Sequence, residues 1–246
     1  MYFVTRKNIK IHRFIGNFDL SKKEVEITNP ENIKQIKDVL RLKKGEKLIL
    51  SDGRGMDVEM TIDLISKNKI TGNIEKIDKP ICVEGFSVTR KVNLYLAILK
   101  KENFELAVQK TVEIGVYRII PIITERTIKT GLNFARLEKI MIEASEQSGR
   151  SVIPILSPIT SFKEALVDGT NSQEKIIFHP TGIVYTPSTN KDAENISIFI
   201  GPEGGFTEKE IKEATENGYT VVSLGHLTLR GETAAMIATY RTAKGI

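Results

Sequence analysis

The 246-residue chain has one cysteine, no tryptophan and only three histidines. A single cysteine, Cys82, forms no internal disulfide and supplies no cysteine-rich metal site, which is typical of a reducing compartment. It also has no neighbouring base, so we expect no thiol nucleophile. The histidines His12, His179 and His226 lie far apart and outside any H-x-x-x-H or H-E-x-x-H arrangement. We therefore expect no metal site.

Long apolar runs are also missing. The longest, residues 92–99, is interrupted by Asn93 and is far too short to cross a bilayer. The N-terminus has no apolar signal-peptide core and no small-residue cleavage site. Apolar residues make up 40% of the chain and charged residues 27%, which excludes disordered, collagen-like and coiled-coil proteins. These features predict a soluble, cytoplasmic protein of one large or two modest domains.

Three common catalytic signatures are absent. The chain has no G-x-G-x-x-G after a strand and no G-x-x-x-x-G-K-[ST]. It therefore lacks the phosphate-binding loops of dinucleotide-binding and P-loop proteins. It has no G-x-S-x-G nucleophile elbow either. Ordinary dehydrogenase and hydrolase chemistry is therefore disfavoured.

The net charge of +5 is concentrated in the first third of the chain. Residues 1–77 hold 16 Lys/Arg and 11 Asp/Glu, whereas residues 78–246 hold 20 of each sign. This asymmetry indicates a polyanion-binding module followed by a neutral one. A solvated lysine-rich surface explains the charge alone equally well.

The elements expected in the first third are mostly strands. Asn29 is a good N-cap for a helix that begins at Pro30 and ends before Gly45. Strands are predicted at residues 47–50, 56–65 and 70–77. This pattern favours a small β-barrel domain over residues 1–77, followed by a connector over residues 78–91.

From residue 92 to residue 246 the pattern changes to strands that alternate with helices. Strands are expected at 92–99, 118–123, 152–156, 175–178, 196–200 and 220–224. Helices are expected at 103–114, 133–148, 161–167, 207–217 and 232–243. Continuous apolar strands between helices predict an α/β domain with a mostly parallel sheet covered on both faces.

Two strand–loop–helix junctions near the C-terminus carry the strongest functional signal. In the first, a buried strand ends in Gly201-Pro202-Glu203-Gly204-Gly205, and Thr207-x-x-Glu210 caps the next helix. In the second, a strand ends at Gly225, and Arg230 and Glu232 precede an apolar helix. Ligands bind beyond the carboxyl ends of strands in such sheets, so the junctions can form two walls of one pocket. The alternatives are tight turns that need glycine for geometry and a surface ion pair between the two charges.

These motifs resemble those of the 16S ribosomal RNA (uracil-N3)-methyltransferases, which belong to the SPOUT class of S-adenosylmethionine enzymes. The resemblance covers residues 12–240, and Leu227 stands where the family usually has an arginine. The matching segments are His12-Arg13-Phe14, Val39-Leu40-Arg41-Leu42, Lys44-Gly45-Glu46, Gln109–Val116, Glu143–Arg150, Ile200–Phe206, Leu224-Gly225 and Leu229–Ala234.

The resemblance implies a PUA-like β-barrel that binds RNA over residues 1–77 and a SPOUT domain with a C-terminal trefoil knot over residues 92–246. It also implies a homodimer that buries the C-terminal helix. S-adenosylmethionine is the expected cofactor, in a cleft made by the knot loops. The implied cofactor-binding residues are His179, Pro180, Ile200, Gly201, Pro202, Glu203, Gly204, Gly205, Leu224, Gly225, Leu227 and Leu229.

The implied reaction is methyl transfer to uracil N3, which must lose its proton. Each pKa unit that the site overcomes costs about 1.4 kcal/mol, and a guanidinium can offset part of that cost. Arg230 is the catalytic candidate, with Glu232 beside it, and Arg13 and Arg41 are the other candidate arginines. The alternative is that Arg230 pairs with Glu232 or Glu203 in a structural role.

Specific RNA recognition requires an exposed uracil, because N3 lies on the pairing edge. The RNA-binding candidates are Arg13, Arg41, Lys43, Lys44 and Arg54, and the expected partner is ribosomal RNA or the small ribosomal subunit. Two other functions stay open. One is a non-catalytic RNA-binding or ribosome assembly factor, and the other is a related knot enzyme that methylates transfer RNA ribose.

Overall fold

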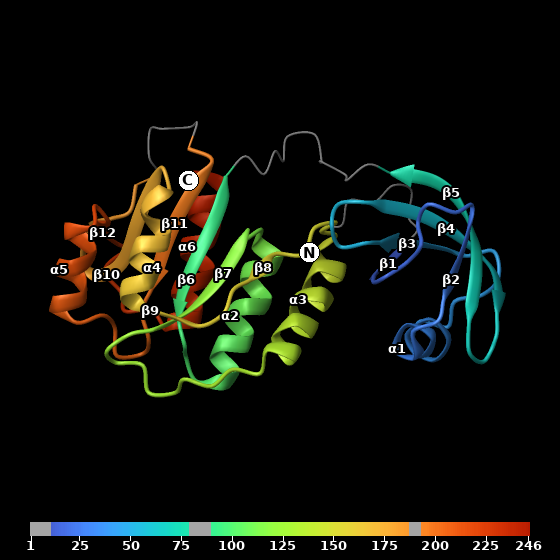
Figure 1. The fold of residues 1–246 in the computed structure, drawn as a ribbon, viewed down its shortest axis with the longest axis horizontal. Coiled ribbons are helices and arrows are strands. Elements are labelled where there is room, and N and C mark those ends of the chain that lie inside the picture. The colour runs from blue at the N-terminus through green and yellow to red at the C-terminus, as the bar shows by residue number, and fades with distance from the viewer. Residues whose placement is uncertain (1–10, 79–89, 187–192) are drawn as a thin grey trace. The chain divides into compact units, whose positions relative to one another are not determined.

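The computed structural model describes residues 11–78, 90–186 and 193–246. Cys82 and most of the predicted connector 78–91 lie outside these residues. The chain divides into two compact units, each of which is described by itself (Figure 1). The first unit takes in residues 1–85 and 145–153, and the second takes in residues 86–144 and 154–246.

The first unit is built on a five-stranded, mainly antiparallel sheet. Its strands run in the order β1 (His12–Ile15), β3 (Lys47–Ser51), β4 (Asp57–Ile65), β5 (Ile70–Asp78) and β2 (Glu24–Ile27). Only the β1–β3 pair is parallel among the pairings recorded for these strands. One apolar core fills the unit, and its largest members include Phe14, Leu48, Leu50, Met60 and Ile70.

The helix predicted after Asn29 is shorter and less regular than expected. Asn29 caps it as predicted, because its side chain accepts the N–H of Glu31 at 2.8 Å. The α-helix α1 (Pro30–Lys34) then widens into a π-helical turn, Gln35–Val39. The wider turn leaves Ile36 fully buried but Val39 67% exposed, so Val39 does not share the buried face of Ile36 as regular helical spacing would require.

The second unit contains a parallel sheet, as the sequence predicts. Its strands run in the order β12 (Thr220–Ser223), β10 (Glu174–Val184), β11 (Asn195–Ile200), β6 (Lys91–Ala97), β7 (Arg118–Ile123) and β8 (Ile155–Leu156), and β9 (Thr160–Ser161) pairs with β7. Every pairing recorded in this sheet is parallel.

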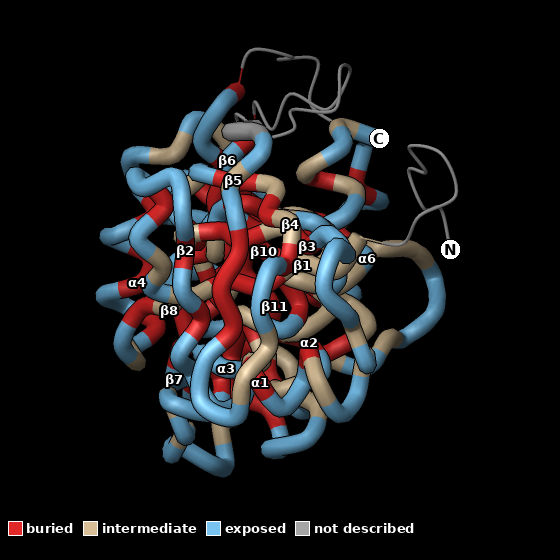
Figure 2. Tube along the Cα trace, turned by 90° about the vertical axis from the view of Figure 1, so that its right-hand side faces the viewer, coloured by how far each residue is buried: buried red, intermediate tan, exposed pale blue. Residues whose placement is uncertain are grey.

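Helices cover both faces of this sheet (Figure 1). On one face, α4 (Phe162–Asp168) and α5 (Glu208–Glu216) pack over the stacked rings of Tyr95 and Phe199, whose centroids lie 4.3 Å apart. The other helices are α2 (Lys101–Ile114), α3 (Phe134–Ser148) and α6 (Gly231–Lys244), and α6 packs against α2, β6 and β11. The strands carry much of the buried chain (Figure 2). None of the described helices has the length and apolarity needed to cross a bilayer.

Two predicted strands differ most from their expected bounds in the structure. The predicted strand 152–156 is reduced to β8, because the backbone before it bonds within the first unit instead. There the N–H of Ile153 donates to Gly53 O and that of Gly55 donates to Ser151 O, both at 3.0 Å. By contrast, β10 extends to Val184, with a register shift against β12 that follows Phe178.

The C-terminal chain crosses the carboxyl ends of the central strands. β12 lies at the outer edge beside β10, whereas α6 packs against β6 and β11 on the far side of β10. The segment between them, residues 224–230, therefore passes over the ends of β10 and β11. This return is the arrangement expected of the predicted trefoil knot, and it creates the site described next.

Candidate functional site

One pocket of about 670 Å³ lies at the carboxyl ends of β10, β11 and β12, beside the N-terminus of α6. Its size is that of a small-molecule site. The pocket is lined by Lys100, Asn103, Phe178, His179, Pro180, Ile200, Gly201, Pro202, Glu203, Gly204, Gly205, Phe206, Ser223, Leu224, Gly225, Leu227, Thr228, Leu229, Arg230, Gly231, Glu232 and Ala234.

The first wall is the loop between β11 and α5. Gly205 has a φ of +69°, a backbone conformation that favours glycine. The ring of Phe206, only 2% exposed, anchors the loop in the core, and its centroid lies 5.5 Å from that of Phe162. Thr207 and Glu210 form the predicted capping box at the start of α5. The glycine backbone that precedes these anchors lines the pocket.

The second wall is the loop between β12 and α6. Gly225 has a φ of +126°, and a Cβ atom there would meet nothing within 4 Å. Leu227, at the position of the family's arginine, is 71% exposed and lines the pocket. Both glycine junctions predicted from the sequence thus form walls of one cavity.

A carboxylate in the first wall links it to the next element. Glu203 Oε1 accepts the backbone N–H of Lys100 at 2.9 Å. Lys100 is the N-cap residue of α2, so this bond satisfies one of the unpaired N–H groups at that helix end. Glu203 therefore holds the loop against the end of β6 through its side chain.

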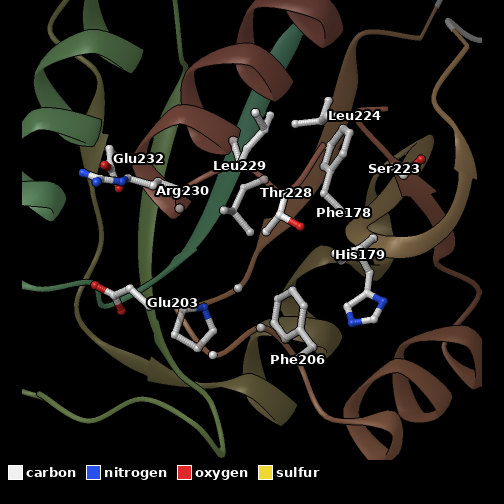
Figure 3. A pocket seen from close by; sticks show the side chains of 18 of the residues that line it. Phe178, His179, Glu203, Phe206, Ser223, Leu224, Thr228, Leu229, Arg230 and Glu232 are labelled. Atoms are coloured by element: carbon white, nitrogen blue, oxygen red, sulfur yellow. The ribbon is translucent and has the colours of Figure 1, made fainter. Parts of the chain in front are cut away.

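Charged and aromatic side chains occupy different parts of the pocket (Figure 3). In that view Glu203, Arg230 and Glu232 lie toward one end, and His179 and Phe206 lie toward the other. This division suits a ligand that has both charged groups and a flat apolar ring.

Arg230 sits at the N-cap of α6 with an exposed side chain. No salt bridge recorded among the described residues involves Arg230, and neither Glu232 nor Glu203 is recorded as its partner. The guanidinium lies beside the positive end of the α6 helix dipole. The guanidinium and the dipole would together stabilise a negative charge that develops on a ligand in the pocket.

Glu232, two residues after Arg230 in the first turn of α6, is only 6% exposed. Its Oε2 atom has no hydrogen-bond partner among the described residues. A buried carboxylate oxygen without a partner is costly, and a positively charged ligand in the pocket would lower that cost.

His179 and Pro180 lie in the irregular part of β10 and not in a separate loop. Burial of the ring, followed by the nearby charge of Arg126, lowers the pKa of His179 below its usual value. The neutral ring is oriented by a 2.7 Å hydrogen bond between its Nδ1 atom and Thr181 Oγ1. His179 is therefore a neutral wall of the pocket at pH 7.

All twelve residues predicted to bind the cofactor line this pocket, together with the catalytic candidates Arg230 and Glu232. Some lining residues were not among the predicted site residues, and two of these, Lys100 and Asn103, come from a third junction. The sequence did contain a signal for these two residues, because the junction between β6 and α2 is another strand end at the edge of the sheet where ligands bind.

The chain matches two family models. A model described as an RNA methyltransferase domain matches residues 87–242, which is more than half of the chain. A model described as an RNA methyltransferase PUA domain matches residues 20–79. The chain belongs to this RNA methyltransferase family. Its α/β unit is accordingly a SPOUT-type domain, and its first unit is PUA-like.

Relatives in this family share most of the chain's length. The ribosomal RNA small subunit methyltransferase E of Rickettsia conorii is 30% identical over 235 residues, with 94% of each chain covered. The Bacillus subtilis protein of the same name is 26% identical, with 89% of this chain and 92% of that protein covered.

Solved structures in the same family include complexes with the cofactor. The crystal structure of a ribosomal RNA small subunit methyltransferase E from Neisseria gonorrhoeae bound to S-adenosyl methionine has a TM-score of 0.83 and 31% identity, and covers 94% of this chain and 95% of that chain. A Legionella pneumophila protein in complex with the same cofactor has a TM-score of 0.77 and 28% identity, and the match covers 94% of this chain and 96% of that one.

The predicted RNA-binding residues have different environments in the PUA-like unit. Arg41, Lys43 and Arg54 are exposed and take part in no salt bridge recorded among the described residues. Lys44 is exposed but pairs with Asp63 at 2.8 Å. These four cations remain candidates for phosphate contacts.

Arg13 is in a different position, because its side chain is only 6% exposed. Its Nη1 atom pairs with Asp57 Oδ2 at 2.5 Å, and Ser151 Oγ donates to the same oxygen at 2.6 Å. A guanidinium held in a buried ion pair presents no free face to a phosphate or to a uracil. The prediction that Arg13 contacts RNA or the reacting base is therefore not supported by its environment, and a structural role fits better.

We expect Arg13→Met to lower the free energy of unfolding by about 3 kcal/mol, because it leaves Asp57 charged, buried and without its partner. Urea denaturation measures this loss. Arg54→Gln is the contrasting variant, since its exposed side chain should leave stability unchanged but weaken RNA binding. Equal stability of Arg13→Met and the wild-type protein would contradict the structural assignment.

Proposed function

We propose that this protein transfers the methyl group of S-adenosylmethionine to N3 of a uracil base in small-subunit (16S) ribosomal RNA. The observation that carries the proposal is the pocket whose two walls are the glycine junctions, in a chain that belongs to an RNA methyltransferase family. The relatives named as small-subunit ribosomal RNA methyltransferases, and the solved relatives with the cofactor bound, support it.

The residues of the pocket fit S-adenosylmethionine. Backbone groups of the two glycine loops and the apolar side chains of Ile200, Leu224 and Leu229 would hold the adenosine part. The acidic wall at Glu232 fits the net positive charge of this cofactor. When bound, the cofactor supplies an electrophilic methyl group on a sulfonium.

The protein's own residues supply orientation and charge. Alignment of the uracil with the methyl donor requires no nucleophilic side chain. We propose that Arg230 and the N-terminus of α6 stabilise the negative charge that develops on the uracil as N3 loses its proton. Glu232 would favour the charged methyl donor over its neutral product.

Arg41, Lys43, Lys44 and Arg54 would supply phosphate contacts that do not depend on base sequence. Binding of RNA should therefore weaken as salt is added. A cytoplasmic location is part of the same proposal, because ribosomal subunits are assembled there.

The purified protein should convert uridine to 3-methyluridine when it is incubated with S-adenosylmethionine and small ribosomal subunits or their RNA. Nucleoside analysis of the RNA detects 3-methyluridine, and calorimetry measures the binding of S-adenosylmethionine to the protein. If the protein binds RNA but does not bind S-adenosylmethionine, the result would favour a non-catalytic RNA-binding or ribosome assembly factor. A ribose-methylated nucleoside in transfer RNA would favour the related knot enzyme.

We also propose that the protein is a homodimer through α6. Ile237 and Tyr240 are 36% and 46% exposed and lie three residues apart, so they share one helix face. Two large apolar side chains on the outward face of a half-buried helix are typical of a protein interface.

Tyr240→Asp should convert the dimer to a monomer, because it introduces a charge into the proposed apolar contact. Analytical ultracentrifugation measures the mass. Val167→Asp is the matched control, since Val167 is 65% exposed on α4 and lies outside the proposed interface. A wild-type protein that sediments as a monomer at micromolar concentration would contradict the proposal.

A further inference from the structure

The loop that follows β7 is held rigidly against the first wall of the pocket. The N–H of Glu125 donates to Glu210 Oε1 at 2.8 Å, and Thr207 Oγ1 donates to Glu125 Oε2 at 3.0 Å. Within the loop, the N–H of Thr124 donates to Thr127 Oγ1 at 2.9 Å. Glu210 is 5% exposed, so the loop is anchored to a buried carboxylate at the start of α5.

This anchor places Arg126 on the glycine loop. The Nη1 atom of Arg126 donates to Gly204 O at 2.7 Å. A Cβ atom on residue 204 would lie 3.3 Å from Arg126 Cδ, so the glycine permits the close approach of the arginine stem. The guanidinium is thereby fixed at the edge of the pocket without being one of the residues that line it.

The rest of the Arg126 guanidinium is available to a ligand. Arg126 is exposed, and no salt bridge recorded among the described residues involves it. One of its five N–H groups is used by Gly204. Its charge also acts on His179, which lines the pocket, so the cation lies within electrostatic reach of the interior.

We propose that Arg126 binds a backbone phosphate of the RNA next to the uridine whose base enters the pocket. The proposal rests on the function proposed above. A base that leaves its stack to enter an enzyme pocket leaves its phosphates outside, at the rim. A planar guanidinium can bind a phosphate through two parallel hydrogen bonds, which fixes orientation as well as charge. Arg126 is thus a positioning residue that sets the register of the target nucleotide.

Arg126→Gln should raise the KM for RNA about tenfold, the equivalent of one lost phosphate contact, and change kcat by less than about threefold. The plot of log affinity against log salt should become shallower by about 0.7 for single-stranded RNA. Affinity for S-adenosylmethionine should stay within about twofold by calorimetry. Arg126→Lys should recover the salt slope, because it restores the charge.

Lys129→Gln is the matched control, because it removes one exposed positive charge three residues further along the chain. It should leave both KM and the salt slope at wild-type values. An unchanged salt slope in Arg126→Gln would overturn the proposal. A parallel loss of cofactor affinity would also overturn it, by showing that Arg126 acts through the Gly204 loop alone.

The failure of this proposal is distinguishable from failure of the proposed function. If the wild-type protein forms no 3-methyluridine, the proposed reaction is wrong, and Arg126 then has no target uridine to position. If the wild-type protein methylates the RNA but Arg126→Gln binds it with the wild-type salt slope, only the phosphate contact is wrong.

Discussion

Arg230→Gln is expected to lower kcat for uracil methylation by about 10²–10³-fold, the usual loss when a group that stabilises a developing anion is removed. The guanidinium lies on the pocket wall at the N-cap of α6 and has no salt-bridge partner recorded among the described residues. It is therefore free to meet the negative charge that appears when N3 loses its proton. Single-turnover methylation with labelled cofactor measures the effect.

The loss should appear in kcat and not in cofactor binding, because Arg230 is proposed to act on the uracil. Calorimetry on Arg230→Gln should give an affinity for S-adenosylmethionine within about threefold of the wild-type value. Arg136→Gln is a suitable control, since Arg136 pairs with Glu105 and does not line the pocket. A wild-type methylation rate in Arg230→Gln would remove Arg230 from the mechanism.

Gly225→Ala is expected to weaken the binding of S-adenosylmethionine by more than about tenfold. A φ of +126° is rarely adopted by residues other than glycine, so alanine forces the loop between β12 and α6 to change its conformation. That loop carries Leu224, Leu227 and Leu229, which form one wall of the pocket. The site would lose the shape to which the cofactor binds.

Gly115→Ala provides a matched comparison. Gly115 has a φ of +116°, and a Cβ atom there, as at Gly225, would meet nothing within 4 Å, but Gly115 lies outside the pocket. Both variants should lose about 1–3 kcal/mol of stability from backbone strain. Only Gly225→Ala should lose cofactor affinity in calorimetry, and equal affinities in the two variants would show that the Gly225 loop does not shape the site.

The secondary structure of the second unit was largely predictable because its signals are local. The strand Arg118–Ile123 has the expected bounds, and α2, α5 and α6 begin and end within two residues of the expected positions. Glycine just past a helix end, a capping box and continuous apolar strands act over a few residues each. The parallel sheet follows from strands and helices that alternate along the chain.

The pocket was predictable in part, for a topological reason. Strand ends in a parallel sheet meet at one edge, so two glycine junctions on nearby strands of that sheet had to lie close together. The contribution of Lys100 and Arg126 was not predictable in the same way. Both come from junctions more than 70 residues earlier in the chain and reach the pocket only because β6 and β7 follow β11 in the sheet.

What the residue pattern decided on its own was the type of most elements in the second unit, the parallel sheet and the two glycine loops, because each depends on neighbours in the chain. Only the tertiary structure decided which charged side chains are free of ion pairs and can contact a ligand. Nothing near Arg13 in sequence indicates that Asp57 and Ser151 will bury it, and nothing near Arg230 indicates that its guanidinium forms no ion pair among the described residues. Burial and pairing of a charge depend on residues far away in the chain, and folding brings those together.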